Sequence, residues 1–340
     1  MGEDDSVAGG IVLRHNPSSR RQAHQGWRTY AMSLLEEAGA VLSENALCKR
    51  CLGRLFGGLS GGMSNLERGE AILTTLTLSV CKDVLDGKEG STKLARKLAA
   101  QFGVAPLEDL LVGRGQRPVR RIRRSCEICK GGLEDIEALA QRIVEDLSGY
   151  EFRTFQVGTI VPAEIERKED KIRSRFGLRY SESIRSEFSR EVGKILERAV
   201  PGKRYSPRPD IRIELNPYSG DVRFFSKKLL VEGEAKILDD GAAVFAKVCP
   251  VCRGKGCEEC GHTGKEKGDS FEFVLGSKLM SLAGGKRWRF GMKRLDEDRI
   301  RFRMSLIRPE KKSLPIEDLL KDANSVLEKR FVLADVKLSH

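Results

Sequence analysis

The chain has 340 residues, of which 61 are Lys or Arg and 49 are Asp or Glu, so its formal net charge is +12 at neutral pH. This length predicts two or three domains, and the lack of any apolar run near 20 residues excludes a membrane-spanning helix. Because residues 1–10 are polar and acidic, unlike a secretory signal, we expect a cytoplasmic protein. The basic excess favours a polyanionic partner, because Lys and Arg that neutralise phosphates release condensed counterions.

The N-terminal third predicts a tail followed by helices. Residues 1–28 are polar and basic, and we expect them to form a flexible tail. From Thr29 to about residue 115, apolar residues recur at helical spacing. A dense basic run, residues 114–124, follows. We expect residues 29–132 to form a helical, zinc-binding region.

The next segment, residues 133–245, predicts one α/β unit. Its helices and strands are recognised from period-3.6 and period-2 apolar patterns. The expected elements are helices at Leu133–Leu147, from near Pro162 and at Ser183–Val200, and strands at Glu151–Ile160, Asp210–Leu215 and Asp221–Phe225. The sequence Asn216–Gly220 between the last two strands is a hairpin signal.

A cysteine-rich knuckle occupies residues 246–268. Its two Cys-x-x-Cys pairs lie four residues apart, a spacing that lets four thiolates hold one tetrahedral zinc ion. The expected ligands are Cys249, Cys252, Cys257 and Cys260. A redox-active dithiol is the alternative interpretation. His262 either competes as a ligand or, as we favour, lies outside the zinc shell and contacts it or a phosphate.

Two more Cys-x-x-Cys pairs stand 74 residues apart. They are Cys48 with Cys51 and Cys126 with Cys129, each flanked by basic residues. In a reducing compartment such pairs are metal ligands more often than disulfides, so we expect a second zinc site. Cys81 lies among apolar residues at helical spacing and is interpreted as a buried, inert thiol.

Residues 269–340 form a short mixed segment. It ends in an expected helix near Ile316–Glu328 and an expected strand near Phe331–Leu338. Together these patterns predict an α+β multidomain protein: a helical zinc-bound region, an α/β unit, a four-cysteine knuckle and a C-terminal α/β segment.

Five segments, in order, resemble the archaeal tRNA pseudouridine-54/55 synthase family. The similarity runs from about residue 40 to residue 276. The segments are Leu47–Phe56, Gly62–Gly69, Cys126–Cys129, Val157–Glu164 and Cys249–Gly264.

From this resemblance we expect the family's domain architecture and its reaction. It implies that the α/β unit is a THUMP domain that binds the tRNA acceptor region, and that Cys48, Cys51, Cys126 and Cys129 share one zinc ion. It also implies isomerisation of uridine to pseudouridine in the TΨC arm without an organic cofactor. An ionised aspartate then attacks the nucleoside, the glycosidic bond breaks, and the base rejoins through carbon.

The expected catalytic loop differs from that of the family. The family carries Gly-Arg-Glu-Asp followed by Asp-x-Arg-Met-Leu-Gly, whereas this chain has Gly291–Met304. Arg294-Leu-Asp296 aligns with the catalytic Arg-x-Asp, so Asp296 is the candidate nucleophile and Asp298 is the second choice. The alternative interpretation is that residues 293–303 are a charged hairpin of solvated side chains.

The C-terminal segment departs from the family in two further ways. No tyrosine follows Tyr218, so a phenylalanine would have to stack on the target base; the candidates are Phe290, Phe302 and Phe331. Residues 269–340 are also shorter than a catalytic domain. We therefore expect a truncated synthase-like segment, with a possible protein partner that completes it.

Basic side chains in two stretches are the candidates for RNA contact. Such contacts position RNA on the protein without reading its sequence, and solvated surface charge is the alternative for each residue. The candidates are Arg114, Arg117, Arg120, Arg121, Arg123, Arg124, Arg185, Lys194, Arg198, Lys203 and Arg204.

Three functions compete at this point. The chain is a tRNA pseudouridine synthase with Asp296 as nucleophile, a catalytically silent tRNA-binding relative that acts with a partner, or an unrelated zinc protein of translation or RNA processing. The order of the five segments argues against the third. A pocket with an ionised aspartate, an arginine and an aromatic face would separate the first two.

Overall fold

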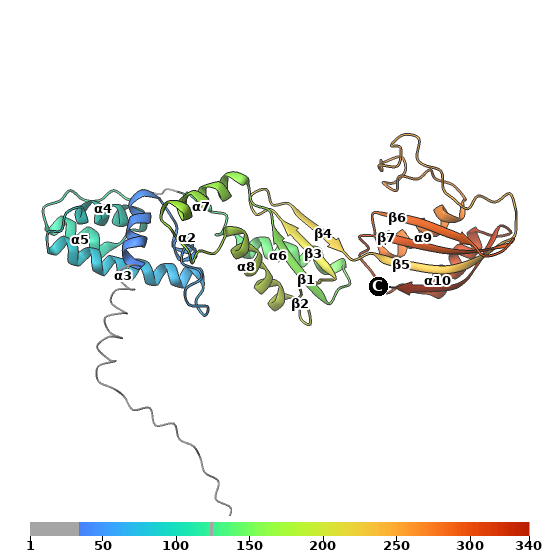
Figure 1. The fold of residues 1–340 in the computed structure, drawn as a ribbon, viewed down its shortest axis with the longest axis horizontal. Helices are drawn as coiled ribbons and strands as arrows, with labels where there is room; N and C mark the ends of the chain where they lie inside the picture. The colour runs from blue at the N-terminus through green and yellow to red at the C-terminus, as the bar shows by residue number, and fades with distance from the viewer. Residues whose placement is uncertain (1–33, 123–124, 340) are drawn as a thin grey trace, which may run out of the picture. The chain divides into compact units, whose positions relative to one another are not determined.

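The computed structural model describes residues 34–122 and 125–339, and the chain forms two compact units (Figure 1). The first unit contains the described residues up to Gly131 together with Ala163–Ile184. The second contains Gly132–Pro162 and the residues from Arg185 onward. The predicted tail, residues 1–28, lies outside the described residues. Within those residues, no helix has both the length and the apolar composition to cross a membrane.

The first unit is built from helices. A helix over residues 34–44 is followed by α2 (Lys49–Arg54), α3 (Asn65–Leu85), α4 (Ser91–Phe102), α5 (Ala105–Gly113) and α7 (Ala163–Arg175). Ser64 begins α3 with a reciprocal cap, since its hydroxyl accepts the Glu67 N–H and the Glu67 carboxylate accepts the Ser64 N–H. The helical region expected between residues 29 and 132 is therefore present.

Helices α2 and α3 cross with their backbones in contact. A Cβ atom added at Gly53 would lie 1.9 Å from the Asn65 carbonyl oxygen, and one added at Gly69 would lie 1.9 Å from the Lys49 carbonyl oxygen. No other residue fits at either position without moving a backbone. The two glycines therefore allow the short helix α2 to lie directly on α3.

A buried ion pair joins α2 to α7. The Arg54 guanidinium lies 3.0 Å from the Glu169 carboxylate, and both side chains are almost completely buried. Burial raises the pKa of Glu169, while the Arg54 charge and the Ile184 N–H oppose that shift. The structure thus places α7 in one unit with α2 to α5, although the sequence predicted the helix after Pro162 as part of the 133–245 unit.

The second unit begins with a four-stranded sheet that we call the first sheet. Its order is β2-β1-β3-β4, with β1 parallel to β2 and β3 and with β3 antiparallel to β4. The strands are β1 (Thr154–Thr159), β2 (Arg204–Tyr205), β3 (Ile211–Leu215) and β4 (Val222–Ser226). The predicted Asn216–Gly220 hairpin is confirmed. A parallel β1–β3 pair requires a long crossover, which α7 and α8 supply.

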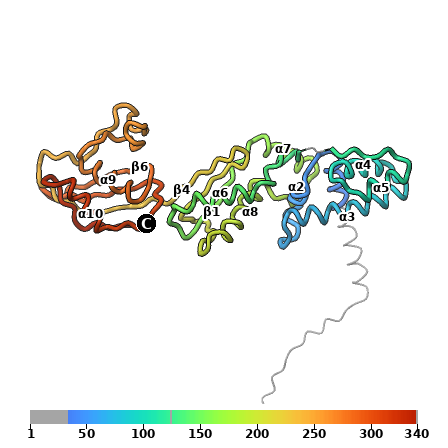
Figure 2. The backbone as a smooth tube through the Cα atoms, turned by 180° about the vertical axis from the view of Figure 1, so that it is seen from behind, coloured from blue at the N-terminus to red at the C-terminus, as the bar shows by residue number. Residues whose placement is uncertain are grey.

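Two helices cover the apolar face of the first sheet (Figures 1 and 2). They are α6 (Ile136–Asp146) and α8 (Ile184–Ala199). The apolar stripe expected on Ser183–Val200 is buried in α8, where Phe188 and Val192 are 0% exposed. Along β1, Phe155, Val157 and Thr159 alternate with half-buried residues, as a strand covered on one face requires.

A second antiparallel sheet, of order β6-β7-β5-β8, completes the second unit. Its strands are β5 (Leu229–Ile237), β6 (Arg287–Arg294), β7 (Arg299–Ile307) and β8 (Phe331–Ser339). Helices α9 (Phe271–Ala283) and α10 (Ile316–Val326) lie against it in both views (Figures 1 and 2). Their apolar residues share one buried cluster with the strands. The helix and strand expected after residue 316 are confirmed as α10 and β8.

Strand β5 lies in a different sheet from the one that the sequence-based domain boundaries predicted. The sequence placed residues 133–245 in one unit, yet β5 pairs with β7 and β8 in the second sheet. Alternate residues of β5, among them Leu229, Val231 and Ala235, are buried in the core that the second sheet forms with α9 and α10. An apolar strand carries no local signal of which sheet it will join.

Removing one partner of the buried ion pair should destabilise the first unit. We expect Glu169→Gln to lower its free energy of unfolding by about 3–5 kcal/mol, because the Arg54 charge stays buried without its counter-charge. The double variant Arg54→Met with Glu169→Leu should lower the free energy of unfolding much less, because it leaves no unpaired buried charge. Urea unfolding followed by circular dichroism measures both.

The exposed Lys82–Asp86 pair is a matched control, since its side chains are 76% and 55% exposed. Asp86→Asn should leave the free energy of unfolding almost unchanged, because an exposed pair contributes little to stability. A Glu169→Gln variant as stable as Asp86→Asn would show that the buried pair does not hold α7 in place.

Candidate metal centres and RNA-contacting surfaces

The first cysteine cluster lies in the first unit and contains Cys48, Cys51, Cys126 and Cys129. Their four Sγ atoms all lie within 4.8 Å of one another, and the Cys48 and Cys129 sulfurs are 3.7 Å apart. A tetrahedral ion with metal–sulfur bonds of about 2.3 Å separates its sulfurs by about 3.8 Å. The arrangement therefore fits a four-thiolate metal site.

Local structure and long-range contacts assemble this cluster. Cys48 is the N-cap of α2, and its sulfur accepts the Cys51 N–H at 3.4 Å. The other pair is held by Glu127: its N–H donates to the Ala46 carbonyl at 2.8 Å, and its carboxylate accepts the Ala46 N–H at 2.8 Å. The Glu127 carboxylate also lies 2.6 Å from the Lys168 ammonium of α7.

The pKa values of the thiols show why such a cluster needs a cation. Hydrogen bonding with Cys126 raises the pKa of Cys48, while hydrogen bonding with Cys129 lowers the pKa of Cys126. Neighbouring thiolates in such a cluster repel one another, so the pKa values of Cys48 and Cys51 are raised while those of Cys126 and Cys129 are lowered. A divalent cation removes this repulsion and allows all four sulfurs to be thiolates.

The second cluster, in the second unit, contains the four cysteines of the knuckle. The sulfur separations are 3.9 Å for Cys249 and Cys257, 3.8 Å for Cys252 and Cys260, and 3.7 Å for Cys257 and Cys260. These distances again match a tetrahedron of sulfurs. The N–H of Cys257 lowers the pKa of Cys260 to about 6, which favours the thiolate.

Tight turns form the knuckle and leave the histidine outside the sulfur cluster. The N–H groups of Gly256 and Gly264 each donate to a cysteine sulfur at 3.2 Å. Gly256 has φ of 95°, and a Cβ there would lie 2.7 Å from the His262 carbonyl oxygen. His262 is exposed and belongs to neither cysteine group found among the described residues.

The six arginines of residues 114–124 fall in or beside the first unit. Arg114, Arg117, Arg120 and Arg121 are exposed, while Arg123 and Arg124 lie outside the described residues. Arg114 donates to the Leu85 carbonyl at 2.9 Å, and the Arg121 guanidinium lies 3.4 Å from the Glu108 carboxylate. Their exposed charge remains available to a phosphate.

The other five RNA-contact candidates lie in the second unit. Arg185, Lys194 and Arg198 are exposed on α8, Arg204 is exposed on β2, and the Lys203 ammonium lies 5.0 Å from the centre of the Phe152 ring. Lys194 pairs with Glu191 at 3.2 Å. The structure thus separates the nine described candidates into two groups, four in the first unit and five in the second.

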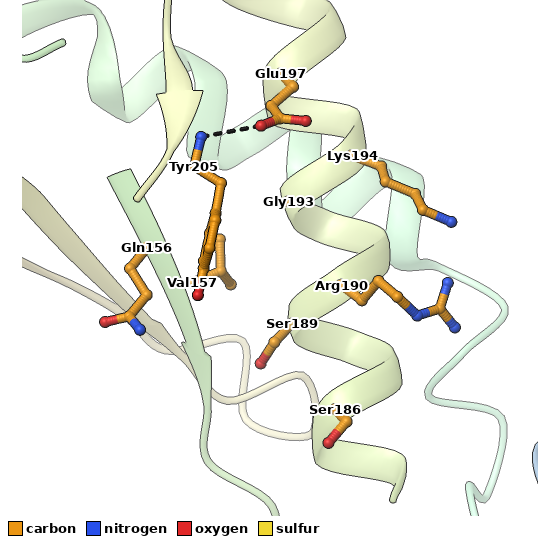
Figure 3. Close-up of a pocket in the computed structure, with 9 residues that line it drawn as sticks. All are labelled: Gln156, Val157, Ser186, Ser189, Arg190, Gly193, Lys194, Glu197 and Tyr205. Carbon is orange, nitrogen blue, oxygen red and sulfur yellow. Dashed lines mark hydrogen bonds between the residues drawn. The ribbon is translucent and has the colours of Figure 1, made fainter. Parts of the chain in front are cut away.

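A hollow of about 400 Å³ opens beside Lys194 between β1, β2 and α8 (Figure 3). The Tyr205 ring reaches into it between Gln156 and α8, while the Tyr205 N–H donates to Glu197 at 2.9 Å. Tyr205 is 56% exposed, as a base-stacking ring must be. Tyr205 and Gln156 were not among the sequence-based candidates; the signal was a tyrosine directly after Lys203 and Arg204.

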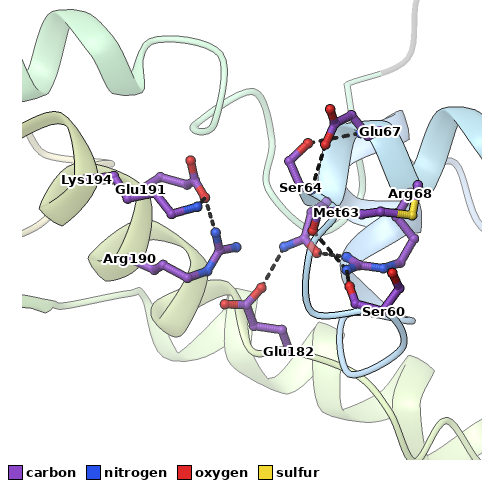
Figure 4. Close-up of polar contacts among 10 residues, drawn as sticks. Ser60, Met63, Ser64, Glu67, Arg68, Glu182, Arg190, Glu191 and Lys194 are labelled. Carbon is purple, nitrogen blue, oxygen red and sulfur yellow. Dashed lines mark hydrogen bonds and ion pairs between the residues drawn. The ribbon is translucent and has the colours of Figure 1, made fainter.

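The Gly62–Gly69 segment of the family resemblance has a structural role in the first unit. The Arg68 guanidinium donates to the Leu59, Ser60 and Met63 carbonyl oxygens at 2.8, 2.9 and 3.0 Å (Figure 4). Asn65 donates to the Glu182 carboxylate at 2.6 Å. These bonds fold the loop before α3 and tie it to the chain after α7.

Figure 4 also shows a separate cluster on α8, in the second unit. The Glu191 carboxylate accepts from the Arg190 guanidinium and from the Lys194 ammonium. Glu191 therefore neutralises part of the positive charge beside the hollow. A phosphate bound there would compete with this carboxylate.

The candidate nucleophile lies at the tip of the β6–β7 hairpin. Asp296 is exposed, and the Arg299 guanidinium donates to its carboxylate at 2.7 Å. This bond lowers the pKa of Asp296, so the carboxylate is ionised at neutral pH. Residues 293–303 are thus the end of a charged hairpin, as the alternative interpretation predicted. Asp298 is half-buried and lies 3.2 Å from the Lys236 ammonium.

The aromatic residues expected to stack on the target base lie in the core. Phe302 and Phe331 are each 1% exposed and pack on Phe271 with ring centres 5.2 Å apart. That expectation is therefore wrong for both, because their rings fill the interior between α9 and the second sheet. Phe290 is half-buried and packs against Phe245 at 5.6 Å.

Comparison with known proteins gives a consistent assignment. Residues 139–216 match the family model described as the Pus10 THUMP domain, archaeal. The chain is similar to the tRNA pseudouridine synthase Pus10 of Methanothrix thermoacetophila, with 28% identity over 86% of this chain and 65% of that protein. It is 39% identical to the protein of the same name from Thermofilum pendens, over 52% of this chain and 38% of that protein.

The alignments cover only part of the length of these relatives. A third, from Methanopyrus kandleri, is 28% identical over 82% of this chain and 63% of its own length. The chain thus spans less than two thirds of the curated relatives it matches first. The matched residues contain β1, β2 and β3 of the first sheet together with α7 and α8, and they end before β4. The chain is therefore similar to Pus10 proteins over most of its described length, and residues 139–216 match the archaeal Pus10 THUMP domain.

Proposed function

We propose that the chain binds tRNA and takes part in the isomerisation of uridine to pseudouridine in the TΨC arm. The observation that carries this proposal is the archaeal Pus10 THUMP domain at residues 139–216. Exposed basic side chains on α8 and β2, beside the Tyr205 hollow, supply phosphate-binding charge and a stacking surface on that domain. The names of the relatives support tRNA as substrate and uridine isomerisation as reaction.

We propose zinc as the ion at both cysteine clusters. Four thiolates at tetrahedral spacing leave no open coordination position, so each ion would hold structure and would not act on substrate. The first set would be Cys48, Cys51, Cys126 and Cys129; the second would be Cys249, Cys252, Cys257 and Cys260. All nine cysteines are free thiols, which supports a reducing, cytoplasmic setting for this function.

Asp296 is the proposed nucleophile, and Asp298 is the second choice. Nucleophilic attack needs an ionised carboxylate. An exposed aspartate is ionised at neutral pH, and the Arg299 bond lowers the pKa of Asp296 further. We propose that tRNA or a protein partner contributes the rest of the pocket, since Asp296 is exposed at the tip of a hairpin.

Tritium release tests the reaction directly. We expect an unmodified tRNA transcript labelled at uridine carbon 5 to release tritium with the protein and not with Asp296→Ala, because only the ionised carboxylate starts the isomerisation. Asp298→Ala is the matched control and should keep most of the activity. Release by Asp296→Ala and none by Asp298→Ala would transfer the catalytic role to Asp298.

No release by the unaltered protein, with tRNA binding confirmed in the same preparation, would contradict catalysis by this chain alone. The chain would then be a tRNA-holding member of the family that acts with a partner.

The arginine run should contribute to RNA affinity through charge alone. We expect replacement of Arg120, Arg121, Arg123 and Arg124 by Gln to weaken tRNA binding and to flatten its salt dependence, by a slope of about one for each lost phosphate contact. Filter binding over a salt series measures both. Replacement of four exposed lysines of the same unit by Gln is the control: Lys82, Lys88, Lys93 and Lys171. Equal losses in the two variants would show that only net charge matters.

Metal analysis should find two zinc ions per chain. We expect Cys126→Ser with Cys129→Ser to retain one, because it leaves only two thiolates in the first cluster. Cys81→Ser should retain two, since Cys81 belongs to neither cluster. One zinc in the unaltered protein would rule out one of the two sites, and the serine variant would identify which.

A further inference from the structure

A cavity of about 620 Å³ in the second unit is lined by basic side chains from three segments. Lys255 and His262 come from the knuckle, Lys286 and Arg287 lie at the start of β6, and Arg308 lies at the end of β7. The other described lining residues are Gly261, Met280, Gly285 and Ile307, so no carboxylate is among them. This cavity is separate from the Tyr205 hollow and from Asp296.

The charges around this cavity lack a protein counter-ion. Within residues 34–122 and 125–339, the structure records no ion pair for Lys255, Lys286 or Arg287. The Arg308 guanidinium lies 4.1 Å from the centre of the Phe225 ring, which holds it in place without neutralising it. Like charges that converge on one hollow repel one another, and a bound anion relieves that repulsion.

A buried carboxylate anchors the knuckle, which supplies residues that line the cavity. The carboxylate of Glu272, which is 1% exposed, accepts the Ala246 N–H at 3.0 Å and the Trp288 indole N–H at 3.2 Å. It also lies 2.9 Å from the Lys265 ammonium. One buried carboxylate thus ties both ends of the knuckle to α9 and β6.

The cysteine turns set the positions of the two knuckle residues. The Lys255 N–H donates to the Cys252 carbonyl at 3.1 Å, and the His262 N–H donates to the Cys257 carbonyl at 2.8 Å. A metal ion bound by the four sulfurs would therefore also fix the backbone at Lys255 and His262. The second cluster lies far along the chain from β6 and β7, yet it completes a cavity with them.

Backbone conformation also distinguishes this cavity. His262 has φ of 61° and Arg308 has φ of 57°, a left-handed conformation that is unfavourable for residues other than glycine. Such conformations cluster at sites where a side chain must be held in one direction. Both residues bring a cationic or hydrogen-bonding side chain to the same hollow.

We propose that this cavity binds phosphate groups of the tRNA backbone, as a second RNA contact of the second unit beside the THUMP domain. The proposal rests on the proposed function for the identity of the polyanion. Phosphodiester oxygens match the lining, because Lys and Arg donate hydrogen bonds and full charge to them. The knuckle would then serve RNA binding by positioning Lys255 and His262 opposite Lys286 and Arg287.

A charge-matched pair of variants tests the site. Lys286→Gln with Arg287→Gln removes two charges from the cavity, whereas Lys321→Gln with Lys329→Gln removes two exposed charges at α10 and just after it. Fluorescence anisotropy with an unmodified tRNA transcript measures affinity over a salt series, and calorimetry with inorganic tripolyphosphate measures anion binding without RNA.

We expect the cavity variant to bind tRNA about tenfold more weakly near 0.1 M salt, with a salt slope reduced by about one to two. It should also lose the tripolyphosphate heat, while the control variant keeps both. A cavity variant that behaves as the control in both assays overturns the site.

The two assays also separate this proposal from the proposed function. Loss of tripolyphosphate binding with unchanged tRNA affinity would leave an anion site that tRNA does not occupy, and would overturn the RNA assignment. If the unaltered protein binds no tRNA, the proposed function fails together with the RNA assignment. Tripolyphosphate binding would then still decide whether the cavity is an anion site.

Discussion

The ion pair between Arg54 and Glu169 is the constraint on which the first unit depends. Helix α2 has only six residues, too few to be stable alone, yet it begins at Cys48 and carries Cys51. One end is held by the cysteine cluster and the other by a buried carboxylate of α7. Because an unpaired charge there would cost several kcal/mol, α7 and α2 form together or not at all. The contact between Gly53 and Gly69 sets how closely α2 approaches α3.

In the second unit, too, a buried carboxylate connects a cysteine cluster to the rest of the fold. Glu272 is a buried carboxylate that holds the knuckle against α9 and β6. In both units a four-cysteine cluster is attached to its surroundings by a buried acid, and basic side chains are exposed nearby. A metal ion held by four cysteines would rigidify a short loop, which lowers the entropy cost of holding the neighbouring side chains in place.

The segments that identify the family in this chain are largely structural. Arg68 and Asn65 in Gly62–Gly69 hold a loop through backbone carbonyls and Glu182, and Gly53 and Gly69 permit a backbone contact that any side chain would block. Such residues have no substitute with the same geometry. The hairpin around Asp296 is exposed and satisfies only local charges, so its sequence can diverge at little cost in stability. The family is therefore recognisable here even though the catalytic loop differs.

The sequence by itself determined the features that depend on neighbouring residues. The four cysteines of the knuckle, the stripe of α8, the β3–β4 hairpin and the charged β6–β7 hairpin are all local patterns, since each lies within one short stretch of the chain. Only the tertiary structure decided that α7 lies in one unit with α2 to α5, that β5 belongs to the second sheet, and that Phe302 and Phe331 are core residues. It also brought Lys255 and His262 to one cavity with Lys286, Arg287 and Arg308. These outcomes depend on which apolar faces and buried charges find partners far along the chain, and a local pattern of residues does not specify that partner.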